Sequence, residues 1–266
     1  MQSRDILERE IGKPRDVWTN ADVVRFALDH GVRTISLMHV GGDGWLKTLD
    51  FAPRSESHVR DIVEGGERAD GSSLFPGMGI PSYASDVVLR PRFRTAFLDP
   101  FTELPTVGMI CNIQDPITRE DYSRDPRNVA RKAVNFMKST GIADTCFIGP
   151  EAEFFIFDDV RFDQNEHEGY YHVDSIEGQW NRGKDTKAAG EGPNLGYKLR
   201  HKEGYFPVPP ADQMMNIRNE MMQAMVDGGL DVECQHHEVA TGGQAEIDLK
   251  YDELVMMADK MLMYKY

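Results

Sequence analysis

In the first half of the chain, apolar residues recur at helical or strand spacing in short segments that turn residues separate. The segment NADVVRFALDH (20–30) carries an apolar face after a capping Asn20, and Gly31 ends it. Apolar runs of strand length follow, at 34–40, 44–51, 86–93 and 106–115. We therefore expect an α+β unit over residues 20–115, with one helix packed on a small sheet.

The second half carries longer helical patterns and a hairpin pattern. The first helix is predicted at 126–139, with Pro126 in its first turn, and the strand pattern ADTCFIGPEAEFFIFDD follows it. A second helix is predicted at 212–227, where Met and Ile recur at helical spacing. The segments LDVECQHHEVA and QAEIDLKY, joined by a turn, predict a β-hairpin.

Two segments of this half depart from simple element patterns. Residues 161–204 are polar and glycine-rich, and we expect them to form a long, partly mobile excursion. A final helical pattern begins at Asp252 and reaches Tyr266 without a stop signal. We therefore expect the natural protein to continue beyond this residue.

Composition and charge narrow the class of protein. The chain has 266 residues, 40% of them hydrophobic, enough for one large or two modest cores. Its formal net charge of −14 argues against nucleic acid and anionic membrane as partners. The charged N-terminus lacks the apolar centre of a signal peptide, and three widely spaced cysteines suit a reducing compartment. The cytoplasm is the expected location.

The strand in GPEAEFFIFD presents two carboxylates on one face. Side chains alternate along a strand, so Glu151 and Glu153 share a face, while Ala152, Phe154 and Ile156 form an apolar face. The two carboxylates repel each other unless a cation lies between them, and oxygen-preferring Mg²⁺ or Mn²⁺ suits such a pair. Spacing alone fits a hydrated strand end equally well.

The segment ECQHHEVATGGQAEID gathers acids and imidazoles around a tight bend. In the predicted hairpin His236 and Glu238 share a face, and Glu246 returns near Glu238 across the Gly242–Gly243 turn. With Glu151 and Glu153, four carboxylates could then converge. Because Mg²⁺ usually serves phosphate chemistry, this arrangement suggests metal-assisted transfer from a nucleotide. Taken alone, the spacing favours a solvated acidic hairpin, and the loop DGSSLFPGMG reads as a turn.

Four segments together resemble glutamine synthetase of the bacterial type I kind. They are DGSS (70–73), GPEAEFF (149–155), GYFPVPPAD (204–212) and HHEVATGGQAEID (236–248), in the family's order. The resemblance implies an α+β fold with a β-grasp-like N-terminal domain at 15–118 and the first part of a catalytic domain at 119–266. Around LMHVGGDGWLKTLDF the chain departs from the family's usual hairpin.

The resemblance also assigns site residues. It implies that Glu153, Glu238 and Glu246 hold one divalent cation and that Glu151 holds a second. Asp70 matches the aspartate that binds and deprotonates ammonium and that reaches into the neighbouring subunit's site. The positions that match the ATP site are Glu233, His236, Leu249, Lys250 and Tyr251. Strict strand alternation puts Glu233 and His236 on opposite faces, so one of them requires a bulge or a strand end. Asp248 is expected to be a surface carboxylate.

The implied reaction joins L-glutamate, ATP and ammonium. The γ-carboxylate of glutamate attacks ATP to give γ-glutamyl phosphate, and ammonia then displaces phosphate to form glutamine. Mg²⁺ or Mn²⁺, two or more per site, offsets the repulsion between the two anions. The resemblance implies two stacked hexameric rings in the full-length protein, and we expect the 266-residue chain to be inactive alone.

Two other functions compete with this one. A related ligase joins glutamate to another amine, and assays with ammonium, methylamine and polyamines distinguish it. A non-catalytic relative keeps only the assembly. The retained set of four crowded glutamates argues against a non-catalytic role.

Overall fold

The computed structural model describes residues 3–74, 79–182 and 194–266. The chain folds into two compact units. The first consists of Met1–Gly149, Met225–Leu230 and Tyr251–Tyr266, and the second of Pro150–Ala224 and Asp231–Lys250. The α+β expectation is confirmed.

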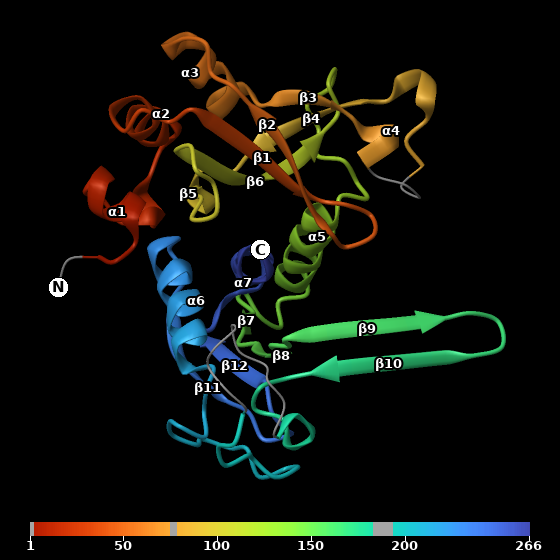
Figure 1. Cartoon of the computed structure of the whole chain (residues 1–266). Coiled ribbons are helices and arrows are strands. Elements are labelled where there is room, and N and C mark those ends of the chain that lie inside the picture. Colours follow the sequence, from red (N-terminus) through yellow and green to blue (C-terminus); the bar gives the residue numbers. More distant parts are fainter. Residues whose placement is uncertain (1–2, 75–78, 183–193) are drawn as a thin grey trace. The chain divides into compact units, whose positions relative to one another are not determined.

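The first unit contains helices and short strands in alternation (Figure 1). Its helices are α1 (Ile6–Ile11), α2 (Asn20–Asp29), α3 (Glu56–Gly65), α4 (Gly71–Leu74), α5 (Pro126–Ser139) and α7 (Leu254–Lys265). Its strands are β1 (Thr34–Val40), β2 (Leu46–Phe51), β3 (Glu67–Asp70), β4 (Asp86–Pro91), β5 (Phe97–Leu98), β6 (Thr106–Gln114), β7 (Phe147–Ile148) and β13 (Asp252–Glu253). The four strand patterns predicted in the first half correspond to β1, β2, β4 and β6.

A six-stranded sheet with the order β2-β1-β6-β4-β3, with β5 also paired to β6, organises this unit. β1 and β6 run parallel, with Leu37 opposite Met109, and the other pairs are antiparallel. β6 is buried along nearly its whole length and lies inside the sheet, whereas the edge strand β2 is largely exposed. The continuous apolar run TVGMICNI is typical of such a central strand.

Three helices supply the apolar residues that pack on this sheet, where the sequence predicted one. Buried residues of α1, α2 and α3 belong to one core cluster with those of the sheet. In α2 the cap is Thr19, which forms a capping box with Asp22, and Asn20 is the first helical residue. The sequence analysis did not predict α3, whose buried Val59, Ile62 and Val63 have helical spacing in an otherwise polar segment.

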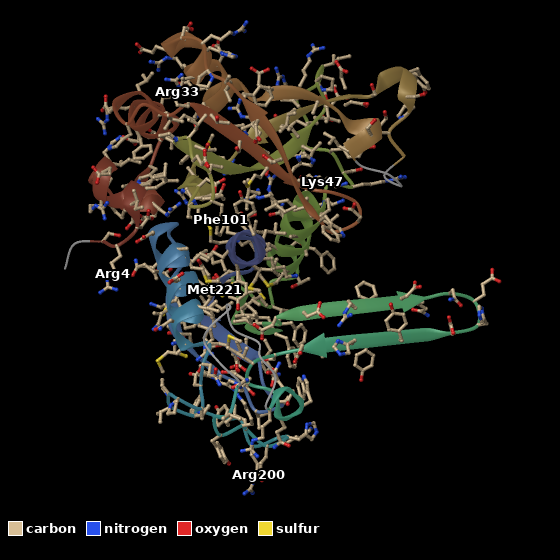
Figure 2. The ribbon with its side chains drawn as sticks, viewed as in Figure 1. Arg4, Arg33, Lys47, Phe101, Arg200 and Met221 are labelled. Carbon is tan, nitrogen blue, oxygen red and sulfur yellow. The ribbon has the colours of Figure 1, made fainter. Side chains whose placement is uncertain are left out.

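The helices α5 and α7 contact each other within the first unit. α5 begins at Pro126 and ends at Ser139, as predicted. Arg127 donates two charged hydrogen bonds to Asp259 of α7, at 3.0 Å from Nε and 2.8 Å from Nη2. Directly after α7, the Tyr266 hydroxyl donates to Asp99 at 2.8 Å, and its ring meets that of Phe101 edge-on. Phe101 is labelled in Figure 2.

The second unit contains the three-stranded sheet β11-β12-β8 and a separate hairpin. The sheet strands are β8 (Glu151–Phe155), β11 (Val232–His237) and β12 (Gln244–Leu249), and the hairpin consists of β9 (Asp159–Gln164) and β10 (Gly169–Asp174). The predicted hairpin of β11 and β12 is confirmed. Helix α6 (Met215–Asp227) begins three residues later than predicted and contributes residues to both units.

The first part of the excursion expected over 161–204 contains regular secondary structure, which the sequence did not predict. β9 and β10 form a regular antiparallel ribbon there, visible in Figure 1. All six residues of β9 are exposed, although Val160 and Phe162 alternate with polar residues as in a strand. Residues 183–193 of the predicted excursion lie outside the described residues. Within the described part of the chain, no helix has the length and apolarity that a membrane span requires.

Candidate metal and nucleotide site

The sheet β11-β12-β8 gathers acidic side chains on one of its faces. In the register, Glu246 lies opposite Glu153 of β8 and His236 of β11. Two residues further along β12, Asp248 lies opposite Glu151 and Cys234. Paired residues of antiparallel strands point to the same face, so strand parity places all six on one face. The sequence predicted this convergence for the four glutamates but not for Asp248.

The opposite face of the same sheet is apolar and fixes the register. Ala245 and Ile247 of β12 are buried, with 0% and 1% exposure, and Ala152 of β8 lies opposite Ile247. A slip of one residue would bury the carboxylates and expose these side chains. The alternating sequence QAEIDL therefore holds the carboxylates on their face.

Glu238 joins this group from the turn after β11. The strand ends at His237, and the backbone N–H of Glu238 donates to the carbonyl of Gln244 at 3.0 Å. Ligand atoms of His236, Glu238 and Glu246 lie within 4.8 Å of one another. Glu238 and Glu246 are both buried, at 7% exposure each, so the group is not the solvated hairpin that spacing alone favoured.

The crowding changes the ionisation of Glu246. Burial, then the neighbouring carboxylates of Asp248 and Glu238, raise its pKa to about 7. His236 offers the nearest compensating group, with Nε2 3.4 Å from Glu246 and Nδ1 3.7 Å from Glu238. Excess negative charge gathered on buried oxygen donors is the setting in which a hard divalent cation binds.

Glu151 and Glu153 are more exposed than the other two glutamates. The Glu153 carboxylate accepts a hydrogen bond of 2.6 Å from Nε2 of Gln244, and this bond fixes its orientation. The structure therefore brings Glu153 opposite Glu246, while the converging ligand atoms belong to His236, Glu238 and Glu246.

The predicted nucleotide positions on β11 and β12 occupy different environments. A register shift lies between Val232 and Cys234, so Glu233 is the extra residue of the bulge that the sequence required, and it is exposed. Leu249 is buried on the face opposite the carboxylates, and Lys250 is exposed directly after the strand.

Asp70 and Tyr251 belong to the first unit. Asp70 ends β3 and accepts hydrogen bonds from the hydroxyls of Ser72 at 2.6 Å and Ser73 at 2.7 Å. These bonds lower the pKa of Asp70 to about 2, so the exposed group is a carboxylate at any ordinary pH. Tyr251 is 59% exposed, and its ring meets Phe147 edge-on.

Sequence reasoning missed an aromatic pair beside the carboxylates. The rings of Tyr205 and Phe206 stack at 3.8 Å, and both meet His236 edge-on. Burial, followed by the charges of Glu238 and Glu246, raises the pKa of Tyr205, so its hydroxyl lies within the field of the cluster. Phe206 has φ of 57°, a left-handed conformation that is strained for a bulky residue.

Asp248 and Cys234 are the other residues whose role the sequence did not predict. Instead of standing alone at the surface, Asp248 accepts a 3.0 Å hydrogen bond from the Cys234 thiol. This bond, with burial second, raises the pKa of Cys234 to about 11. Strand register was the available signal, because the regular pairing that starts at the turn places Cys234 opposite Asp248.

Comparison with known protein families independently supports the resemblance to glutamine synthetase. The glutamine synthetase β-grasp domain family matches residues 31–116, and the glutamine synthetase catalytic domain family matches residues 123–266. The domain boundaries predicted at residues 15, 118 and 119 stay predictions.

Curated relatives named glutamine synthetase align along nearly the whole chain. The protein from Nostoc sp. is 51% identical over 250 residues, which cover 93% of this chain and 51% of the relative. The protein from Aquifex aeolicus is 50% identical over 249 residues, covering 94% and 50%. The chain thus spans about half the length of the curated relatives it matches.

Solved structures agree in fold. The cryo-EM structure of Plasmodium falciparum glutamine synthetase superposes with a TM-score of 0.76 at 27% identity, covering 93% of this chain and 47% of that one. The GmaS/ADP complex, at 16% identity and a TM-score of 0.63, shares the fold and covers 91% and 47%. With both family domains matched in order along the chain, the protein belongs to the glutamine synthetase family.

Proposed function

We propose that the protein carrying this chain is a glutamate–ammonia ligase, which forms L-glutamine from L-glutamate, ammonium and ATP. The single observation that carries the proposal is the buried group of His236, Glu238 and Glu246, with Glu153 opposite Glu246 across the sheet. Family membership gives this group its proposed chemistry. ADP and phosphate are the other products.

The donor set fits Mg²⁺ or Mn²⁺. The proposed ligands are Glu153, Glu238 and Glu246 for one cation and Glu151 for a second, all of them oxygen donors. The raised pKa of Glu246 reflects uncompensated negative charge around it, which a bound cation would offset. Bound divalent cations supply the charge that lets a carboxylate and a triphosphate approach each other.

The chain's own residues provide binding and orientation around these cations. The proposed neighbours of ATP are Glu233, His236, Leu249, Lys250 and Tyr251. The side chain of Leu249 points to the opposite face of the strand from the carboxylates. Gln244 holds Glu153 in one orientation through its hydrogen bond. Asp70, ionised at neutral pH, is suited to hold ammonium and accept its proton.

The proposed setting is a homo-oligomer of two stacked hexameric rings in the cytoplasm. The support is the resemblance, which matches Asp70 to an aspartate that reaches into the neighbouring subunit's site. If Asp70 acts there, a complete active site requires an oligomer. The free thiols of Cys111, Cys146 and Cys234 support a reducing compartment.

Metal binding by this chain tests the proposal directly. Titration of free Mn²⁺ by electron paramagnetic resonance should show saturable binding, and Glu246→Gln and Glu238→Gln should each weaken it by at least tenfold. Glu203→Gln is the matched control, because Glu203 is exposed and pairs only with Arg200 at the surface among the ion pairs described. No saturable binding by folded wild-type chain would overturn the metal assignment.

Activity separates the ligase from its alternatives. Glutamine formation should be measured on the natural full-length protein, with methylamine and polyamines as parallel acceptors. Equal or better rates with another amine would replace ammonium as the substrate. Metal binding without any ATP-dependent ligation would favour the non-catalytic role.

A further inference from the structure

Beside the proposed catalytic carboxylates, β11 and β12 present a second group of different chemistry. Ligand atoms of Cys234, His236 and Asp248 lie within 4.8 Å of one another. The three residues provide one sulfur, one nitrogen and one oxygen donor. None of the glutamates is needed to complete this set.

Asp248 carries a buried oxygen that the protein does not satisfy. Its Oδ2 accepts the hydrogen bond from the Cys234 thiol at 3.0 Å. Its Oδ1 is buried, and the described part of the chain offers it no hydrogen-bond partner. A buried carboxylate oxygen without a donor is costly, and a cation is one of the few groups that offsets the cost.

A route to the group exists from solvent. Cys234 is exposed, and together with His236 it lines a cavity of about 300 Å³. Solvent therefore reaches the Cys234 and His236 side of the group, from which a water molecule can supply a further ligand. Three protein ligands with an open position are sufficient for a four-coordinate cation.

We propose that Cys234, His236 and Asp248 form a site for a thiophilic divalent cation of the Zn²⁺ class. Thiolate and imidazole favour such ions, whereas Mg²⁺ prefers oxygen donors alone. On binding, the cation takes the place of the thiol proton, which leaves Cys234 for solvent, and Asp248 exchanges its hydrogen bond for a metal bond.

The site has a consequence for the neighbouring carboxylates. His236 belongs both to this group and to the group with Glu238 and Glu246. A divalent cation bound there lies beside these carboxylates and repels a second cation, so the thiophilic cation should weaken Mn²⁺ binding without occupying the glutamates. The site itself does not depend on the proposed ligase activity.

Cobalt is the probe for this site, because a Co²⁺–thiolate bond gives a charge-transfer absorption in the near ultraviolet. The wild-type chain should develop this band to one equivalent, and Zn²⁺ should abolish it. Cys234→Ser should remove the band and Asp248→Asn should weaken cobalt affinity by at least roughly tenfold, the lower end of what loss of an outer-shell partner costs. Cys146→Ser is the matched control and should leave the band unchanged.

Mn²⁺ titration of the same samples distinguishes this proposal from the proposed function. Zn²⁺ should raise the apparent Kd for Mn²⁺ in wild-type protein but not in Cys234→Ser, while both proteins bind Mn²⁺ alone equally. A cobalt band that survives in Cys234→Ser, or that is absent from wild-type protein that binds Mn²⁺, would overturn the thiol site and leave the ligase proposal standing.

Discussion

The buried carboxylate of Glu177 and the imidazole of His237 form an ion pair of 3.2 Å directly behind the acidic face of the sheet. Nδ1 of His237 lies 2.7 Å from the carbonyls of both Gly204 and Glu238, and Nε2 faces Glu177. Both ring nitrogens thus face acceptors, which favours the charged form of His237 and raises its pKa. Glu177 also accepts the N–H of Gly243 at 2.8 Å, which ties it to the turn that carries Glu238.

Glu177→Ala should lower the free energy of unfolding by about 3–5 kcal/mol, since it leaves a buried imidazolium unpaired. It also frees the Gly243 end of the turn, so Mn²⁺ affinity should fall although Glu177 is no proposed ligand. Urea denaturation and Mn²⁺ titration measure the two effects. Glu203→Ala, in an exposed pair with Arg200, should cost less than about 1 kcal/mol. A Glu177→Ala protein as stable as that control would contradict the role of the pair.

The same pair predicts how stability changes with pH. Burial alone would lower the pKa of His237, but Glu177 raises it above its usual value. Burial alone would raise the pKa of Glu177, but the hydrogen bond from His237 lowers it. The stabilisation from His237 is therefore lost as pH rises through its raised pKa, above 6.5, and that from Glu177 as pH falls through its lowered pKa, below 4.5. In Glu177→Gln protein both changes should become smaller.

Glu246 should change stability with pH in the opposite direction to Glu177, because its pKa is raised and not lowered. Its pKa of about 7 means that the folded, metal-free protein loses stability as pH rises from 4.5 through 7, because the charged form is penalised. Glu246→Gln should therefore stabilise the metal-free chain at pH 8 by on the order of 1 kcal/mol, after solvent screening, and have little effect at pH 4.5. Mn²⁺ affinity of the wild type should fall below pH 7, where protons compete. If the difference in unfolding free energy between Glu246→Gln and wild type were the same at both pH values, the raised pKa of Glu246 would be ruled out.

The first unit offers a double-mutant test. Arg127 is tied to the buried Asp259 by hydrogen bonds between α5 and α7. Asp259→Leu should cost about 3–5 kcal/mol, because it leaves a buried guanidinium unpaired. The double variant Arg127→Met with Asp259→Leu should cost much less than the sum of the two single losses. Thermal unfolding of the four proteins measures the coupling, and additive losses would show that the ion pair is unimportant.

How far the sequence predicts this fold depends on where its patterns are strong. The apolar runs of β1 and β6 and the Pro126 signal of α5 locate those elements closely, since burial and capping act on neighbouring residues. In β9 all six residues are exposed, and the alternation of Val160 and Phe162 is too short to stand out in the polar, glycine-rich segment around it. The sequence analysis placed the N-cap of α2 at Asn20, one residue after the actual cap Thr19, because Asn is also a good cap residue.

The site shows the same limit. Alternation along a strand predicts that Glu151 and Glu153 share a face. Which residues of other strands join them depends on register: the register set at the turn pairs Cys234 with Asp248, and the bulge at Glu233 shifts only the pairing beyond them. The aromatic ring of Tyr205 reaches the cluster from a loop more than 20 positions earlier in the chain, a contact that no local pattern specifies.

Gln244 provides a last prediction, because its amide donates one hydrogen bond and accepts another. Nε2 donates to Glu153 and Oε1 accepts the N–H of Ala240, each at 2.6 Å. Gln244→Glu keeps the acceptor for Ala240 but places a second carboxylate against Glu153, so the metal-free protein should lose about 1–3 kcal/mol at pH 8. At pH 5 one shared proton restores a donor, and the loss should shrink. Gln244→Met removes both bonds, so its loss should not depend on pH. Chemical denaturation of the three proteins at the two pH values tests the argument, and equal losses for Gln244→Glu at both would show that Gln244 does not orient Glu153.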